Sequence, residues 1–478
     1  MLTVEILLDI LGLLLGGIGL ATPTIEYYLK KRISRWLCLA AILLALALSI
    51  GLLSLTLGNP PTYVYDGALK IDAYGAFLFT ITSLGALFVT LASFTHTSKW
   101  TTAPSYFSLI LIITVGVYYI IAVNDLVLLL AAWALVSVAS YAFVGIKKDE
   151  ASLEGAAKYA LMGIVASAFL LFGIAILYGV TGSTDIRTIV QAASPANMQA
   201  ILTAIIMIVA AFGFKVGIVP FHGWLPDVYG GVNPILVSYI AGIVKVSGIA
   251  ALLRIVYPFA PKLGVSWLFL FAAFAIVTMT FGNVAALIQR NFQKMMGYSS
   301  LAHVGYMLVG FAAGGSGVSA TIGAQGIALH LATYALATTG IFVALSYLAE
   351  KGLGTDLDGI AGLWRKMPIL SSCIVILVFS LIGMPPLIGF WSKFMYLFFS
   401  VIEIAPWLAL IAVINTGVSV GYYAQIIRYV LSTRGTDDRN EVRENPRDPA
   451  VIAVVLTTVL TVALGLGLAP VLASLLIL

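Results

Sequence analysis

Apolar stretches long enough to cross a membrane follow one another along the whole chain, separated by short polar segments. A helix of about 20 apolar residues spans the ~30 Å hydrocarbon core of a bilayer, so each stretch predicts one transmembrane helix. The stretches around 152–180 and 319–350 are longer and predict tilted helices. We therefore predict an all-α membrane protein with fourteen spans, which start near Thr3, Trp36, Asp72, Tyr106, Asp125, Ser152, Gln199, Asn233, Trp267, Tyr298, Gly323, Pro368, Ala405 and Asp448.

The composition supports this class and excludes several others. Hydrophobic residues make up 61% of the chain and charged residues 9%, far from the values of soluble proteins. The first stretch contains Glu5 and Asp9 and lacks a basic leader, which predicts a retained span rather than a signal peptide. The two cysteines, Cys38 and Cys373, fall in different spans, and no phosphate-binding loop motif occurs. We expect no metal, iron–sulfur cluster, nucleotide or other cofactor in this chain.

The basic residues predict the orientation in the cell membrane. Sorting Lys and Arg by alternate loops places seventeen on one side and only Lys70, Arg187, Arg254 and Lys262 on the other. The positive-inside rule makes the first side cytoplasmic, so both termini lie outside. The polar stretch 431–449 then becomes a cytoplasmic loop. The net charge of +5 reflects this orientation and not binding to nucleic acid.

A short motif occurs twice and predicts two broken helices. "GIVPFHGWLPD" (217–227) and "GMPPLIGFWSK" (383–393) share the pattern G-x-x-P-x-x-G followed by an aromatic residue. The copies fall in spans seven and twelve, which cross in opposite directions because they lie five spans apart. Broken spans in inverted positions are typical of transporters built from inverted repeats. The predicted helix breaks contain Pro220 in the first copy and Gly383, Pro385 and Pro386 in the second.

This repeat predicts the organisation of the chain. Two inverted five-helix repeats would contain spans four to eight and nine to thirteen. The predicted units are 1–103 with spans one to three, 104–258 with the first repeat, 264–432 with the second, and 433–478 with the cytoplasmic loop and span fourteen.

Four lysines, Lys158, Lys215, Lys245 and Lys393, lie within the apolar spans. An ionised lysine at the bilayer centre costs about 2.5–3.5 kcal/mol on insertion scales. Four of them would cost on the order of 10 kcal/mol, which rivals the whole stability of a typical protein. Unwound backbone at the breaks requires cover by protein or water and predicts a hydrated interior. We therefore interpret the lysines as proton carriers, although Lys215 alone could also snorkel to the surface.

Other polar residues are candidates for the same path. His222, His303 and His330 lie in or beside spans seven, ten and eleven, where they could relay protons or simply join packed helices. Glu154 and Lys158 are four residues apart and share one helix face. They could belong to the path or form a salt bridge at the membrane interface.

Three long segments resemble a known family. They are "FKVGIVPFHGWLPDVYGGVNPILVSYIAGIVKVSGIAALLR" (214–254), "NVAALIQRNFQKMMGYSSLAHVGYMLVG" (283–310) and "SLEGAAKYALMGIVASAFLLFGIAILYGVTG" (152–182). They are similar to the antiporter-like subunits of respiratory complex I and of Mrp Na⁺/H⁺ antiporters, and the resemblance covers roughly residues 70 to 430. It implies that spans seven and twelve are broken and that Lys158, Lys215, Lys245 and Lys393 form a proton path in the membrane plane.

Details of the resemblance favour the N-type subunit. A lysine in span twelve suits the N-type, L-type and D-type Mrp subunits, and His330 followed by Tyr334 in span eleven resembles the N-type. The function implied is a proton-translocating subunit of an NADH–quinone oxidoreductase or an archaeal F420H2 dehydrogenase. The implied partners are M-, L-, K-, J- and H-type subunits and lipid, with flavin and iron–sulfur clusters in partner subunits. A D-type Mrp subunit and a non-conducting spacer stay as alternatives.

One position departs from the family. The family has a glutamate in span five, where this chain has Ala134, and Asp125 is a distant substitute. We expect no carboxylate from span five near Lys215, with water or a polar residue in its place. A distance of about 4 Å between Asp125 and the Lys215 amine would make Asp125 the relocated partner.

Overall fold

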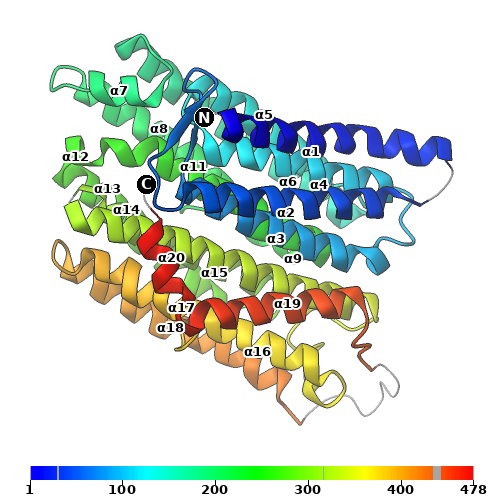
Figure 1. The fold of residues 1–478 in the computed structure, drawn as a ribbon. Coiled ribbons are helices and arrows are strands. Elements are labelled where there is room, and N and C mark those ends of the chain that lie inside the picture. Colours follow the sequence, from blue (N-terminus) through cyan, green and yellow to red (C-terminus); the bar gives the residue numbers. More distant parts are fainter. Residues whose placement is uncertain (1, 30–31, 316, 434–442, 477–478) are drawn as a thin grey trace.

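A computed structural model describes residues 2–29, 32–315, 317–433 and 443–476 of the protein. Most of these residues lie in helices that run side by side (Figure 1). The described strands form one antiparallel hairpin of β1 (Thr62–Val64) and β2 (Leu69–Ile71). The predicted all-α class is therefore confirmed. Residues 434–442 of the predicted polar loop lie outside the described residues.

The helices follow the apolar stretches of the sequence, and short polar residues mark several of their starts. Asp125 and Asp149 accept hydrogen bonds from backbone N–H groups in the first turns of α5 and α6, which satisfies donors that a helix start leaves free. The α-helices are α1 (Leu2–Leu29), α2 (Ser34–Thr56), α3 (Ala73–His96), α4 (Ala103–Ala122), α5 (Leu126–Val144), α6 (Glu150–Thr181), α7 (Ile186–Ala192), α8 (Met198–Val216), α9 (Leu225–Gly231), α10 (Pro234–Tyr239), α11 (Lys245–Val256), α12 (Ala260–Leu263), α13 (Val265–Leu287), α14 (Phe292–Ala312), α15 (Gly317–Glu350), α16 (Pro368–Ile382), α17 (Ile388–Phe390), α18 (Pro406–Val430), α19 (Pro449–Ala463) and α20 (Ala469–Leu475).

Seven short segments with tighter or wider turns join these helices. The π-helical segments are η1 (Ile240–Val244), η5 (Trp391–Phe398) and η7 (Leu464–Leu468), and the 3₁₀ turns are η2 (Tyr257–Phe259), η3 (Ala313–Gly315), η4 (Leu363–Arg365) and η6 (Phe399–Val401).

Twelve helices in the described part are long and apolar enough to cross a membrane. The two other predicted spans correspond to α14 and α16. Polar residues such as Gln293, Lys294 and His303 interrupt the apolar character of α14. Helix α16 has only 15 residues, because it ends before Gly383. The count of fourteen spans therefore stays a prediction.

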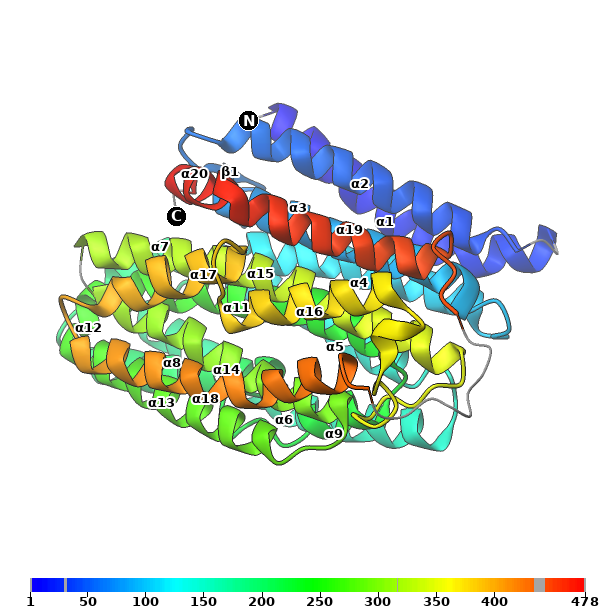
Figure 2. The ribbon, with the colours of Figure 1, turned by 90° about the horizontal axis from the view of Figure 1, so that it is seen from below.

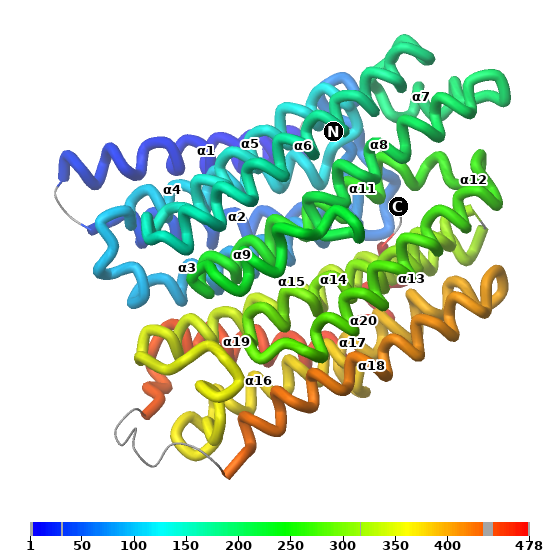
Figure 3. Tube along the Cα trace, turned by 180° about the vertical axis from the view of Figure 1, so that it is seen from behind, coloured from blue at the N-terminus to red at the C-terminus, as the bar shows by residue number. Residues whose placement is uncertain are grey.

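The two ends of the bundle differ. The β1–β2 hairpin, α7 and α12 gather at one end, which we call the hairpin end (Figure 1). The short helix α9 lies toward the opposite end, which we call the basic end because its loops carry Lys147, Lys148, Lys351 and Arg365 (Figure 3). Neither the hairpin nor α7 was predicted, because elements of three to seven residues are too short to show a hydrophobic period.

The long helix α15 forms the centre of the fold. It packs against α3, α10, α14, α16 and α19, and its most apolar stretch is fully buried. The continuous helix made of α10, η1 and α11 is buried along its length as well. In contrast, α1 and α2 lie at one edge of the bundle (Figure 2) and expose apolar side chains such as Leu13 and Leu20. Most polar groups on α15 and α11 are therefore well shielded inside the bundle.

Candidate functional site

Two helix breaks occupy the positions of the repeated motif. The first separates α8 from α9, follows Gly217 (φ +86°) and contains Pro220. The second separates α16 from α17, follows Gly383 (φ +95°) and contains Pro385 and Pro386. Glycine adopts positive φ without a steric penalty, and proline has no N–H to continue a helix. Both features stop a helix inside a span and leave backbone carbonyls free there.

Lys215 lies in the last turn of α8, next to the first break, and its side chain is buried. Its ammonium donates a hydrogen bond to Ser137 Oγ at 3.0 Å and lies 4.5 Å from the centre of the Trp133 ring. A cavity of about 10 Å³ adjoins it, lined also by Tyr141 and Tyr159, which is close to the smallest space that holds one water molecule. A hydroxyl and a ring face take the place of a carboxylate here.

No described carboxylate pairs with Lys215, and the structure explains why Asp125 cannot. Asp125 caps the start of α5 and accepts hydrogen bonds from Val127 N (2.8 Å) and Thr184 Oγ1 (2.6 Å). Ala134 is exposed on the outward face of α5, whereas Ser137 points inward. A polar residue therefore stands beside Lys215, as we expected, and Asp125 is not its relocated partner.

Lys245 is the first residue of α11 and directly follows the π-helical segment η1. Such segments are rare and often mark functional positions. The Lys245 ammonium donates to the backbone O of Ser300 at 3.0 Å and forms a short hydrogen bond with Ser300 Oγ. Ser300 Oγ in turn lies 2.7 Å from the Tyr334 hydroxyl. The predicted residues Lys245 and Tyr334 are thus joined through a serine that the sequence did not single out.

Two buried histidines form the centre of a hydrogen-bonded chain between α14, α15 and η5. His303 Nδ1 lies 2.9 Å from His330 Nε2. The other nitrogens of the two rings reach Tyr423 Oη and Ser392 Oγ, each at 2.9 Å. Each ring nitrogen either donates or accepts according to the tautomer, so the chain can reverse its direction. Packing alone does not require this end-to-end arrangement.

Lys393 directly follows Ser392 and lies in the π-helical segment η5, with a fully buried side chain. Its ammonium donates to the carbonyls of Leu381 (2.6 Å) and Ile382 (3.4 Å). These carbonyls end α16, where the helix dipole is negative and a cation is stabilised. The ring of Tyr306 lies 4.4 Å away. The second break therefore frees the backbone carbonyls that accept the hydrogen bonds of the Lys393 ammonium.

The three buried lysines, Lys215, Lys245 and Lys393, share one electrostatic feature: none of them pairs with a described carboxylate. Among the described residues Asp72 is the only buried carboxylate, and it pairs with Arg254 and Lys70 instead. An ammonium without a counterion is costly in such surroundings. This arrangement suits groups that exchange a proton better than groups that carry a permanent charge.

Lys158 does not belong to this buried set and forms the salt bridge that we gave as the alternative, so its place in the proton path stays a prediction. Its side chain is 44% exposed and pairs with Glu154 (2.9 Å) and Asp227 (3.2 Å). Lys294 lies 3.3 Å from the same Asp227. These four residues line a cleft of about 280 Å³. Hydropathy placed Lys158 in a span, but α6 is apolar on all sides and so does not reveal which face turns away from the bundle.

His222 also lies outside the chain of buried groups. It follows Pro220 in the first break, is partly exposed, and packs against Phe281 with 4.6 Å between ring centres. The sequence missed the residues that connect the lysines and histidines, above all Ser137, Ser300 and Ser392. Only Ser392 carried a signal, its position next to Lys393. Within the described residues no group of three His, Cys, Asp or Glu side chains could hold a metal ion.

Comparisons with known proteins point to one family. The family described as NADH:quinone oxidoreductase/Mrp antiporter, transmembrane, matches residues 123–419. The chain is 36% identical over 404 residues to F(420)H(2) dehydrogenase subunit N of Methanosarcina mazei, covering 82% of this chain and 80% of that protein. It is 33% identical over 429 residues to NADH-quinone oxidoreductase subunit N 2 of Symbiobacterium thermophilum, covering 84% and 83%. A chain of respiratory complex I from Thermus thermophilus, solved with bound aureothin, has a TM-score of 0.80 and 30% identity, covering 97% of this chain and 98% of that chain.

Proposed function

Because the chain belongs to the NADH:quinone oxidoreductase/Mrp antiporter transmembrane family, we propose that it is the N-type proton-translocating subunit of a complex I-like oxidoreductase. The relatives above are N subunits of an NADH-quinone oxidoreductase and of an F420H2 dehydrogenase. Electron transfer takes place in partner subunits, which hold flavin and iron–sulfur clusters. This chain contributes the proton path.

The observation that carries the proposal is the series of polar groups between the two helix breaks. It runs from Lys245 through Ser300 to Tyr334, and from His303 through His330 to Ser392, next to Lys393. Lys215 extends the series on the side of the first break. Successive hydrogen-bonded groups with exchangeable protons are what a proton relay in a membrane requires.

Each group has a role in the proposed path. The lysines hold a proton for part of the cycle and release it when the neighbouring site becomes a better acceptor. The histidine pair passes a proton between Tyr423 and Ser392 by exchanging tautomers. The free carbonyls at the end of α16 stabilise the proton on Lys393. Water molecules in the interior bridge the gap between Lys215 and Lys245. In this region α11 approaches the Lys215 side chain at Gly248.

The proposal includes the arrangement in the membrane. The basic end faces the cytoplasm, so that both termini lie outside. Residues 104–258 and 264–432 form two inverted repeats, supported by the two motif copies that each combine a glycine with positive φ, a proline and a buried lysine nearby. The membrane partners are M-, L-, K-, J- and H-type subunits and lipid.

Purification of the intact complex tests the proposal against its alternatives. We expect the chain to copurify with flavin- and cluster-containing subunits, and donor oxidation to drive proton uptake into inverted vesicles without Na⁺. Copurification with small antiporter subunits and Na⁺-dependent proton movement would identify a D-type Mrp subunit instead. Unchanged pumping after Lys245→Met would identify a spacer.

A further inference from the structure

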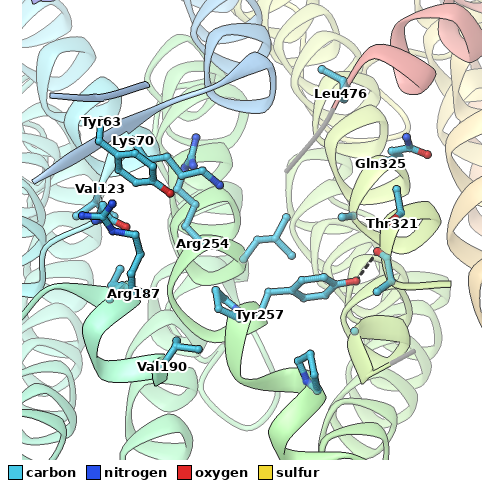
Figure 4. A pocket seen from close by; sticks show the side chains of 18 of the residues that line it. Tyr63, Lys70, Val123, Arg187, Val190, Arg254, Tyr257, Thr321, Gln325 and Leu476 are labelled. Atoms are coloured by element: carbon cyan, nitrogen blue, oxygen red, sulfur yellow. Dashed lines mark hydrogen bonds between the residues drawn. The ribbon is translucent and has the colours of Figure 1, made fainter. Parts of the chain in front are cut away.

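A cavity of about 650 Å³ lies at the hairpin end, between the hairpin, α7, α11, α15 and α20 (Figure 4). None of the three buried lysines is among the described residues that line it. Sites that hold a whole small molecule usually measure about 300–1,000 Å³. The cavity is therefore large enough for a ligand and is separate from the proposed proton path.

The two walls of the cavity differ in chemistry. Lys70 from β2, Arg187 from α7 and Arg254 from α11 lie on one side, near Tyr63 (Figure 4). No carboxylate occurs among the described lining residues. The rest of the lining is largely apolar and includes Pro258, Pro261, Ala320, Ala324 and Leu476, with Thr321 and Gln325 across from the cations (Figure 4). A ligand that fits both walls is an anion with an apolar body.

The charges behind the basic wall are only partly balanced. Asp72 accepts hydrogen bonds from Arg254 at 2.6 and 2.9 Å and lies 3.2 Å from Lys70, so one carboxylate serves two cations. Asp72 is itself 2% exposed and does not line the cavity. Burial lowers the pKa of Lys70 against the opposing effect of Asp72, and the charge of Arg254 lowers it further. An anion in the cavity would offset this excess of positive charge.

Arg187 is held at the rim in a position that leaves donors free. Its guanidinium carbon lies 3.9 Å from the centre of the Tyr63 ring, and one nitrogen pairs with Asp185 at 3.2 Å. Asp185 also accepts hydrogen bonds from Thr188 and Asn124. The planar guanidinium presents several N–H groups and suits two oxygens of a phosphate group.

We propose that this cavity binds the headgroup of an anionic phospholipid. The phosphate contacts Lys70 and Arg187, and the glycerol and the first part of the acyl chains lie along the apolar wall. The cavity lies where the apolar helices end, which is the level of lipid headgroups in a bilayer. A free phosphate ion would leave the apolar wall without a function.

Titration of the purified full chain in neutral detergent tests this proposal. The probes are dihexanoyl phosphatidylglycerol, the corresponding phosphatidylcholine, glycerol phosphate and inorganic phosphate. Thermal unfolding is followed through the reaction of Cys38 and Cys373 with a thiol dye, because both cysteines are buried in the folded chain. We expect stabilisation by phosphatidylglycerol at concentrations about tenfold lower than by any other probe.

Matched variants locate the binding site. We expect a double change of Lys70→Gln and Arg187→Gln to raise the phosphatidylglycerol concentration at half-effect about tenfold. Lys147→Gln, which removes a cation from an exposed ion pair at the basic end, should leave it unchanged. Ala324→Phe keeps the charges and fills the cavity, and it should abolish the effect.

Each of the following results would overturn the proposal. Equal stabilisation by phosphatidylcholine would exclude recognition of the anion, and equal stabilisation by glycerol phosphate or inorganic phosphate would exclude a lipid. Loss of the effect in Lys147→Gln, or its persistence in Ala324→Phe, would place the binding elsewhere.

Discussion

Replacing His330 by phenylalanine removes the middle of the histidine chain while it keeps a flat ring of similar size. His330 bonds His303 on one side and Ser392 on the other, each at 2.9 Å. Without its two nitrogens both hydrogen bonds between His303 and Ser392 are lost, and one hydrogen bond of about 3.2 Å cannot replace two such bonds and the ring between them. His330 is fully buried, so we expect no water to replace the missing groups.

The magnitude follows from the role of such groups. A positioned proton donor or acceptor contributes about 10²–10⁴-fold to a proton transfer. We therefore expect transfer through the second half of the chain to fall by about two orders of magnitude. His303 Nδ1 loses its partner, which costs about 1–3 kcal/mol of stability, whereas Ser392 Oγ keeps its contacts with Gly389 O and Thr333 Oγ1. The melting temperature of the complex should therefore be measured alongside.

Inverted membrane vesicles provide the assay. A pH-sensitive dye reports proton uptake, and the ratio of protons to electrons separates pumping from electron transfer. His222→Phe is the matched control, because His222 lies outside the chain and should tolerate the same substitution. A normal ratio in His330→Phe would refute the relay, and an equal loss in His222→Phe would show that the effect is not specific.

Three further substitutions test other parts of the site. Ser137→Ala removes the acceptor of the Lys215 hydrogen bond, and a hydrogen bond to a charged group is worth about 1.5–3 kcal/mol. Proton uptake should therefore slow about tenfold in Ser137→Ala but not in Ser137→Thr, which keeps the hydroxyl. Equal rates of proton uptake in the two variants would contradict this role of Ser137. Ala134→Glu places a carboxylate on the outward face of α5, which costs about 2.5–3.5 kcal/mol in lipid. The yield of the chain expressed without its partners should therefore fall, and coexpression with the partners should restore it. If the yield without partners does not change, this face of α5 does not contact lipid. Asp227→Asn breaks exposed ion pairs worth about 0–1 kcal/mol each, so the melting temperature should hardly change; a large decrease would make the cluster around Lys158 structural.

The sequence predicted the parts of the molecule that depend on local pattern. Apolar runs identified the long helices, and the repeated motif located both breaks because glycine and proline act on their own backbone. Lys215, Lys245 and Lys393 could be selected because charge is costly in an apolar span. Local pattern was sufficient in each of these cases.

The remaining features depend on which helices meet in space. Lys158 looked buried because hydropathy records composition, not whether a side chain turns outward from the bundle. Ser137 lies 78 positions from Lys215 in the chain, so nothing in the sequence connects them. The cavity at the hairpin end joins Lys70, Arg187 and Arg254 from three separate elements, and no single motif contains them.

The central claim is that protons cross the membrane through the buried lysines, and Lys393 tests it most directly. Lys393→Met keeps the length of the side chain but removes the group that carries the proton, and Lys393→Arg keeps a charge that cannot be released at any accessible pH. The measurement is the number of protons taken up per electron pair in vesicles that contain the assembled complex. We predict that both variants assemble and pump fewer protons than the unaltered complex. Pumping at full stoichiometry in Lys393→Met would contradict the account, and full pumping in Lys393→Arg would show that Lys393 serves as a fixed charge.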